Sequence, residues 1–157
     1  MDRIQRERVC LEMLLSPYNP ILWKAYHSPS AIYCVTEHYR AEPLGFFLKQ
    51  DFLSKNAFRN LLAQVVMALG QLHESNYVYN AVDLTSVYIT EDGYIMLNCF
   101  QDCCEIGTDL SKPEFEHLVR NRPPEDKHSK KVTTGWDWWA LGRMIEQIRE
   151  VKKKQEG

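Results

Sequence analysis

The sequence predicts an α+β fold, with helices and short antiparallel hairpins in separate stretches of one chain. Apolar residues recur at three- and four-residue intervals near 2–15, 54–72 and 137–149, which indicates helices. Short runs typical of strands near 21–37 and 87–98 surround turn-forming residues, which indicates hairpins. The 157 residues suffice for one domain with its own core, and no repeat or linker divides them.

The first part of the chain predicts a helix followed by a hairpin. The helix spans about residues 2–15, and Ser16–Pro20 ends it because proline cannot continue the helical hydrogen bonds. Ile21–His27 and Ala31–Glu37 then read as two strands, joined by a turn at Ser28–Ser30. The apolar positions of the helix are Ile4, Val9, Leu11, Met13 and Leu14.

A short helix at Pro43–Lys49 precedes the longest helix of the chain. Ser54 is a suitable N-cap for the long helix because its hydroxyl can accept a hydrogen bond from an amide of the first turn. Both flanks of its apolar stripe are also apolar, so we expect this helix to be buried at the centre of the fold. The stripe consists of Phe58, Leu61, Leu62, Val65, Val66, Leu69 and Leu72.

The C-terminal half predicts a second hairpin and a final helix. Val87–Thr90 and Tyr94–Asn98 flank the turn Glu91–Gly93. The stretch Cys99–Thr134 is polar and contains prolines, and no regular element is predicted there. The final helix spans Asp137–Arg149. Its predicted apolar face consists of Trp138, Leu141, Met144, Ile145 and Ile148.

The charge balance gives no sign of a nucleic-acid-binding protein. Nineteen Lys and Arg against 21 Asp and Glu leave a net charge of −2. We interpret the only basic run, Lys152–Lys154, as a solvated helix end, with nucleic-acid or lipid binding as the less favoured alternative. No run of 18 apolar residues occurs, and no signal-like apolar region follows the charged N-terminal residues. We therefore expect a soluble, unsecreted protein without membrane insertion.

The five cysteines favour a reducing location, such as the cytoplasm. Their number is odd and their positions are scattered, which does not suit a disulfide framework. Cys99, Cys103 and Cys104 lie close together in the sequence, but a zinc site usually needs a paired C-x-x-C motif and a fourth ligand. Free thiols in or beside the core are the favoured interpretation.

Several motifs resemble those of protein kinases, in the same order and at the same spacing. Leu72-His73 ends the long helix, and Pro124-Glu125 resembles the kinase Ala-Pro-Glu motif. Tyr79 and Asp137–Gly142, with the sequence DWWALG, resemble the AGC group, which includes the cyclic-nucleotide-dependent and ribosomal-protein kinases. The intervening matches to the catalytic segment are Ser86–Ile89, Asp92–Ile95 and Cys99–Gln101.

This resemblance implies a partial protein-kinase-like fold, mostly the helical large lobe with a remnant of the small lobe. Residues 1–39 would form the small-lobe remnant and hinge, and residues 40–157 the partial large lobe. Thr36 takes the gatekeeper position and Glu37 begins the hinge. The glycine-rich loop, the lysine-bearing strand and the last large-lobe helices of the family have no counterpart, so we expect a domain truncated at both ends.

The resemblance also implies that the family's catalytic residues are replaced. Kinases act by placing Mg²⁺, phosphates and the acceptor hydroxyl with charged groups. Because those groups are missing, we expect no catalysis and no binding of ATP, Mg²⁺ or another metal. Tyr88 lies where the family has a modest aliphatic residue under the adenine ring, which its phenol could fill. The replaced positions are Asn80 for arginine, Ala81 for the base aspartate, Asp83 for lysine, Ser86 for asparagine, Cys99 for the metal-binding aspartate and Gln101 for glycine.

Residues with a structural role in the family are retained, namely Tyr79, Phe100, Glu125 and Asp137. The sequence therefore predicts a pseudokinase that acts as a protein-interaction scaffold or allosteric regulator. One alternative is a structural subunit or relic held in a larger complex, and another is an unconventional kinase-fold enzyme. We expect a protein partner and no nucleic acid, and the uncovered fold elements leave room for a homo- or hetero-oligomer.

Overall fold

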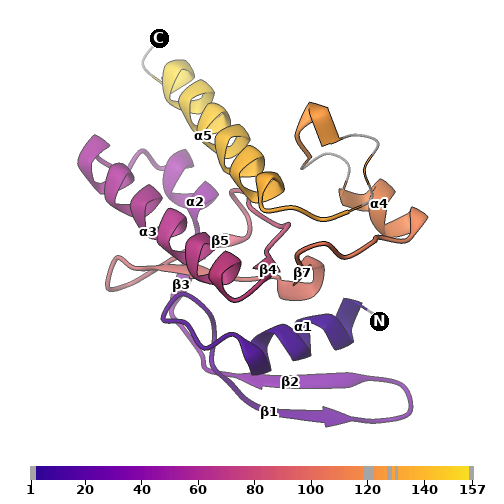
Figure 1. Cartoon of the computed structure of the whole chain (residues 1–157). Coiled ribbons are helices and arrows are strands. Elements are labelled where there is room, and N and C mark those ends of the chain that lie inside the picture. Colours follow the sequence, from indigo (N-terminus) through magenta and orange to yellow (C-terminus); the bar gives the residue numbers. More distant parts are fainter. Residues whose placement is uncertain (1–2, 119–121, 127–128, 130, 156–157) are drawn as a thin grey trace.

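The computed structural model describes residues 3–118, 122–126, 129 and 131–155 (Figure 1). It contains helices and three small antiparallel sheets, which confirms the α+β fold class. The elements in chain order are α1 (Arg3–Met13), β1 (Leu22–His27), β2 (Ile32–Thr36), β3 (Ala41–Pro43), α2 (Leu44–Lys49), α3 (Lys55–Glu74), β4 (Tyr77–Val78), β5 (Val87–Thr90), β6 (Ile95–Leu97), η1 (Phe100–Asp102), β7 (Cys104–Glu105), α4 (Lys112–Leu118), η3 (Pro124–Asp126) and α5 (Gly135–Gln155).

The N-terminal part consists of α1 and the β1–β2 hairpin. The strands pair antiparallel, with His27 opposite Ile32 and Leu22 opposite Thr36, so the predicted hairpin is confirmed. The Ser28 hydroxyl stabilises the turn by accepting a hydrogen bond from the Ala31 amide at 3.0 Å. In Figure 1, α1 lies between this hairpin and the rest of the molecule.

A three-stranded antiparallel sheet, in the order β3-β5-β6, contains the second predicted hairpin. Gly93 adopts φ +80° in its turn, a left-handed conformation that glycine takes without steric cost. Strand β3 was not predicted, because three residues that include proline give too little pattern. The two-residue strands β4 and β7 also pair with each other and fall below the length that sequence periodicity can indicate.

Helix α3 begins as predicted, since the Ser54 hydroxyl accepts a hydrogen bond from the Ala57 amide at 3.2 Å. The prediction that the helix is buried on both flanks is wrong for one flank, where Val66 and its neighbour Met67 are exposed. The Tyr18 hydroxyl lies 3.9 Å from Met67 Sδ, at the edge of this exposed flank. The buried face consists of Leu61, Val65, Ala68, Leu69 and Leu72.

Helix α5 is longer than predicted, and its predicted buried face is confirmed only in part, at Leu141, Met144 and Ile148. Trp138 and Ile145, expected in the core, are 40% and 37% exposed. The helix begins at Gly135, so Trp136 lies within it and starts a stripe at four-residue intervals that points inward. The buried residues are Trp136, Asp137, Ala140, Leu141, Met144 and Ile148.

The stretch predicted to be irregular contains α4 and the short helices η1 and η3, so that prediction is wrong. Helix α4 begins with a local capping arrangement. The amide and hydroxyl of Ser111 donate to Glu114 Oε2 at 3.0 and 2.6 Å. Such contacts stabilise a helix too short to show a clear apolar period.

The buried side chains form two clusters. The larger one joins α1, α3, α5 and the three-stranded sheet, and the smaller one surrounds Trp136. No helix in the described part of the chain combines the length and apolar character needed to cross a membrane.

Candidate functional site

Asp137 organises the centre of the candidate site from the first turn of α5. Its side chain is completely buried. Oδ2 accepts a hydrogen bond from the Tyr79 amide and Oδ1 accepts one from the Asn80 amide, both at 2.8 Å. His73 Nε2 lies 2.8 Å from Oδ2. One carboxylate thereby connects α5, the end of α3 and the loop that follows β4.

Tyr79 and Phe100 form an aromatic contact beside this carboxylate. Both side chains are buried, and their ring centroids lie 5.4 Å apart at an interplanar angle of 64°. The Tyr79 hydroxyl donates to the carbonyl of Asn98. Burial raises the pKa of Tyr79 well above its ordinary value, so the phenol stays protonated. This contact joins the loop after β4 to the segment after β6.

Polar groups of the loop at 81–86 form hydrogen bonds with one another. Asp83 Oδ1 accepts hydrogen bonds from the amide and hydroxyl of Thr85, both at 2.7 Å, and from the Ser86 amide at 2.8 Å. The Ser86 hydroxyl accepts from the Asp83 amide at 3.0 Å and donates to the Ala81 carbonyl. These groups close a compact turn, and Ala81 contributes no acid or base.

Asn80 is buried and also turned inward. Its backbone is left-handed, with φ +60°, which asparagine tolerates better than most residues. Its Nδ2 donates to the Asp102 carbonyl at 3.0 Å and lies 3.3 Å from Cys104 Sγ. The side-chain amide of Asn80 therefore connects the loop after β4 to η1 and β7.

Cys99 lies at the start of η1 with φ +68°, a costly conformation for a non-glycine residue. Burial raises the pKa of its thiol, and the carboxylates of Glu7, Asp83 and Asp102 raise this pKa further. Metal coordination requires a thiolate, whereas these effects keep the Cys99 thiol protonated when no cation is bound. Within the described residues, no group of three or more His, Cys, Asp or Glu side chains is arranged to hold a metal ion.

The replaced catalytic positions line one cavity of about 520 Å³. Asn80, Ala81, Asp83, Ser86, Cys99 and Gln101 all contribute to its wall. Helix α4 adds Glu116 and His117, and His117 Nε2 lies 3.4 Å from Asp102 Oδ2. The described lining carries the carboxylates of Asp83, Asp102 and Glu116 but no lysine or arginine. Its electrostatics therefore oppose a phosphate group.

The three residues predicted for the nucleotide pocket lie away from that cavity's described lining. Thr36 pairs with Leu22 at the end of β2, and Tyr88 is half-buried in β5. The Glu37 carboxylate accepts a hydrogen bond from the Tyr39 hydroxyl at 2.5 Å. Burial, followed by this contact, raises the pKa of Tyr39 to about 12. The Glu37 carboxylate thus binds a residue two positions further along the chain.

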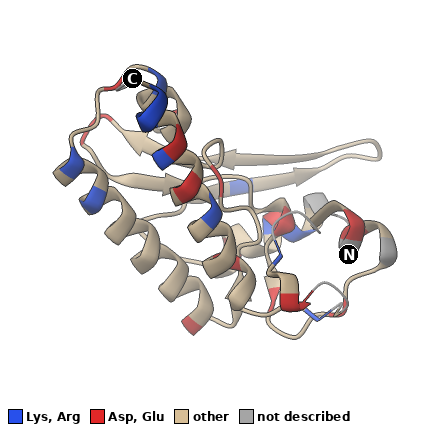
Figure 2. Cartoon of the chain, turned by 90° about the horizontal axis from the view of Figure 1, so that it is seen from above, with Lys and Arg blue, Asp and Glu red and all other residues tan. Residues whose placement is uncertain are grey.

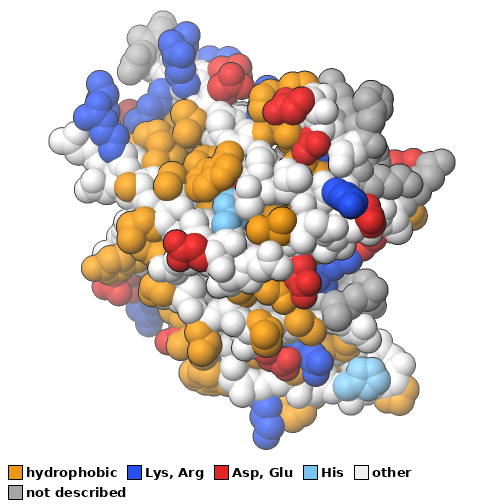
Figure 3. Space-filling model, viewed as in Figure 1, with side chains coloured by type: hydrophobic (Ala, Val, Ile, Leu, Met, Phe, Trp, Pro, Cys, Tyr) orange, Lys and Arg blue, Asp and Glu red, His pale blue; other side chains and the backbone are white. Residues whose placement is uncertain are grey.

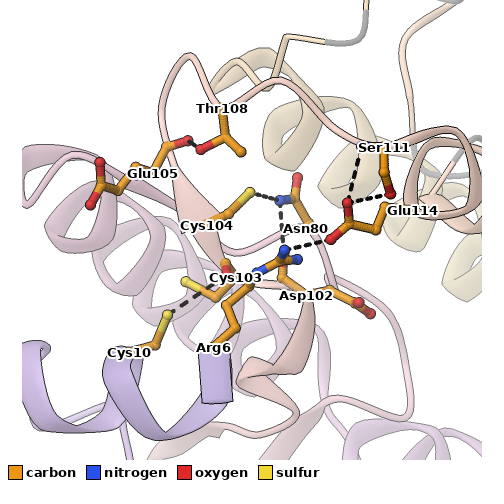
Figure 4. Close-up of polar contacts among 10 residues, drawn as sticks. All are labelled: Arg6, Cys10, Asn80, Asp102, Cys103, Cys104, Glu105, Thr108, Ser111 and Glu114. Atoms are coloured by element: carbon orange, nitrogen blue, oxygen red, sulfur yellow. Dashed lines mark hydrogen bonds and ion pairs between the residues drawn. The ribbon is translucent and has the colours of Figure 1, made fainter. Parts of the chain in front are cut away.

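A partly buried ion pair between α1 and α4 was not predicted (Figure 4). Arg6 Nη2 lies 2.5 Å from Glu114 Oε1, and their side chains are 10% and 26% exposed. Hydrogen bonds from Ser111 and Arg6 outweigh burial and lower the pKa of Glu114 to about 2. The sequence spacing S-x-x-E at Ser111–Glu114 was a usable signal for the capping box, but nothing local indicated Arg6.

The predicted structural position Glu125 is exposed, and its neighbour Asp126 makes the contacts in this region. Asp126 Oδ2 accepts hydrogen bonds from Trp136 Nε1 at 2.8 Å and from the Thr133 hydroxyl at 3.2 Å. The Arg122 guanidinium stacks on Trp136, with Cζ 3.8 Å from the centre of the ring. These three residues were not singled out from the sequence.

Comparisons with known proteins identify relatives along almost the whole chain. The family model described as "Protein kinase domain" matches residues 1–153. The chain is 27% identical over 148 residues to protein kinase C zeta type of Oryctolagus cuniculus, covering 92% of this chain and 25% of the relative. It is 27% identical over 149 residues to serine/threonine-protein kinase Sgk1 of Xenopus tropicalis, covering 92% and 35%. The chain thus spans about a quarter to a third of the length of these relatives.

Proposed function

The chain belongs to the protein kinase family, with relatives of the AGC type as the sequence predicted, and we propose that it is a catalytically inactive member that acts by binding a protein partner. The proposal describes a pseudokinase that serves as a scaffold or allosteric regulator. It includes the absence of ATP and Mg²⁺ binding. The proposed location is the cytoplasm or another reducing compartment, which the five free cysteines support.

The inward-facing loop at 81–86 is the observation that carries the proposal. Phosphoryl transfer requires side chains that hold metal and nucleophile in place, with little covalent chemistry of their own. Here Asp83 and Ser86 satisfy each other and the surrounding backbone, and Ala81 has no proton acceptor. Recruiting Asp83 through Oδ1 would require breaking the three hydrogen bonds from Thr85 and Ser86 that hold the turn. The neutral thiol of Cys99 does not replace a metal-binding carboxylate.

Thermal unfolding with ATP and Mg²⁺ tests the inactive state. A ligand present at 100 times its dissociation constant stabilises a protein by about 2.7 kcal/mol, which is roughly 5 to 10 °C for a domain of this size. We expect no Mg²⁺-dependent shift. ATP without Mg²⁺ and Mg²⁺ alone are the controls. A reproducible shift that requires both components would overturn the proposal.

A restored variant makes the negative result interpretable. Ala81→Asp, Ser86→Asn and Cys99→Asp together return the carboxylates and amide that the family uses, and the matched control is Ala81→Ser, Ser86→Ala and Cys99→Ser. If the chain retains a usable scaffold, the restored variant gains a Mg²⁺-dependent shift and the control does not. Metal-dependent nucleotide turnover by the natural chain would instead favour the unconventional enzyme.

The exposed face of the β1–β2 hairpin supports the binding part of the proposal. Trp23, Tyr26, Tyr33 and Val35 are all exposed on this small sheet, and aromatic residues are enriched where proteins bind one another. Each strand pairs only with the other within the described residues, so both outer edges are available to a further strand.

The same hairpin keeps the structural-subunit alternative open. Sedimentation velocity over a range of concentrations separates the two functions. A folded monomer at low concentration supports the regulator, whereas a chain that unfolds or aggregates on dilution without a partner supports the subunit. A Trp23→Lys variant should reduce any association through this face, and Trp138→Lys is a control on another surface.

A further inference from the structure

One end of the molecule carries a strong positive charge, although the whole chain is slightly acidic. Two segments far apart in sequence, 49–59 and 149–155, meet there. Lys152 Nζ donates to the Leu53 carbonyl at 2.8 Å, and Gln155 Nε2 donates to the Leu48 carbonyl at 3.0 Å. In the ribbon of Figure 2, Lys and Arg positions gather where the C-terminal part of α5 approaches the start of α3. We name these two segments the basic end.

The basic end contains seven Lys or Arg against two Asp or Glu, a formal charge of +5. The chain as a whole carries −2, so all other residues together carry −7. This separation orients the molecule in an electric field, because opposite charges lie in different regions. The exposed cations of the basic end are Lys49, Lys55, Arg59, Arg149, Lys153 and Lys154.

Two exposed phenylalanines lie within or next to these cations. Phe52, in the loop between α2 and α3, is 69% exposed, and Phe46 on α2 is 45% exposed. Figure 3 shows blue and orange side chains side by side at this end of the molecule. The five cavities described along the chain lie elsewhere, and their walls include neither phenylalanine and none of these cations.

We propose that the basic end binds the surface of a lipid bilayer with anionic headgroups. Exposed cations attract such a surface, and exposed aromatic rings enter its interfacial region. The exposed rings of Phe46 and Phe52 favour a bilayer over a soluble acidic peptide, because a bilayer interface takes up aromatic side chains beside the cations. The acidic remainder of the chain faces away from the bilayer. This binding is peripheral and does not depend on whether the chain is catalytically inactive.

Co-sedimentation with vesicles tests the proposal on the full chain. Vesicles of phosphatidylcholine with 30% phosphatidylserine should bind the chain, and vesicles of phosphatidylcholine alone should not. Each basic side chain near the surface changes the partition coefficient about five-fold, which corresponds to about 1 kcal/mol. The variant R59Q/K153Q/K154Q should therefore bind about 100-fold more weakly. Raising the salt from 0.1 to 1 M, which shortens the Debye length from about 10 to about 3 Å, should also release the chain.

A charge-matched variant separates this surface from overall charge. Arg8→Gln, Lys24→Gln and Arg40→Gln change the net charge equally but lie on α1, β1 and the segment before β3. This variant should bind anionic vesicles like the natural chain, and Phe52→Ser should bind less well. Far-ultraviolet circular dichroism checks that each variant is folded.

Three results would overturn the proposal. They are equal loss in both triple variants, unchanged binding of R59Q/K153Q/K154Q, and binding to soluble poly-glutamate without binding to anionic vesicles. The last result would assign the basic end to an acidic protein partner.

Discussion

Replacing Asp137 by alanine removes the acceptor around which the candidate site is organised. The carboxylate is completely buried and accepts hydrogen bonds from the amides of Tyr79 and Asn80, both at 2.8 Å. His73 also contacts it at 2.8 Å. The two amides have no route to solvent that would compensate for the loss. His73 is partly exposed and can turn to water.

The expected cost follows from these contacts. A buried donor left without an acceptor costs about 1 to 3 kcal/mol, so two amides give a loss of about 2 to 6 kcal/mol for Asp137→Ala. Asp137→Asn retains one acceptor but presents an amide group to the other donor, and we expect a loss of about 2 to 4 kcal/mol. Total stabilities are usually about 5 to 15 kcal/mol, so either variant is strongly affected.

Urea unfolding followed by circular dichroism measures these losses. In a parallel thermal scan, the melting temperature of Asp137→Ala should fall by roughly 4 to 24 °C. Glu150→Ala, at an exposed position on the same helix, should change the free energy of unfolding by less than about 0.5 kcal/mol. A loss below about 1 kcal/mol for Asp137→Ala would refute the view that this carboxylate holds the loop in place.

Other predictions concern an ion pair, a helix cap and a strained residue. The pKa of Glu114 is lowered to about 2 from an ordinary value of 4.5, so its stabilising effect is complete above about pH 4.5 and is lost as the pH falls toward 2. Glu114→Gln should remove this part of the pH dependence of the urea midpoint, and an unchanged profile would contradict the lowered pKa of Glu114 in the folded chain. Ser54→Ala should lower the free energy of unfolding by about 1 kcal/mol, whereas Ser54→Asp should preserve it; equal losses in chemical denaturation would argue against the cap. Cys99→Gly should be more stable than Cys99→Ala by about 1 kcal/mol, because only glycine takes φ +68° without cost, and the reverse order would disprove strain at this position.

The elements predicted correctly are those whose burial leaves a regular pattern in the sequence. Helix α3 follows from its apolar period and from Ser54, and the β1–β2 hairpin follows from two strand-like runs and a turn. Helix α4 was missed because seven residues show little periodicity and its stability depends on capping by Ser111 and Glu114. The buried face of α5 was predicted correctly at Leu141, Met144 and Ile148, but Trp136 was missed because the first turn was left outside the predicted helix.

The sequence predicted which residues lie in the candidate site, but it did not predict the conformations of their side chains. Motif spacing indicated which positions share the cavity at Asn80 and Cys99, but it could not show that Ser86 and Asp83 turn into their own loop. That outcome depends on rotamers and on competition among nearby hydrogen-bond partners. The Arg6–Glu114 pair joins residues 108 positions apart, and only the folded chain brings them together.

The exposed indole on the hairpin gives the chain an optical reporter of its own. Trp23 is 67% exposed on β1, whereas Trp136 is buried beneath Arg122. A quencher such as acrylamide reaches the first ring readily and the second poorly, so fluorescence divides into accessible and protected fractions. A partner that covers the hairpin should shift the Trp23 emission to shorter wavelength and shield it from quenching, and comparison with Trp23→Phe isolates that signal from the other tryptophans.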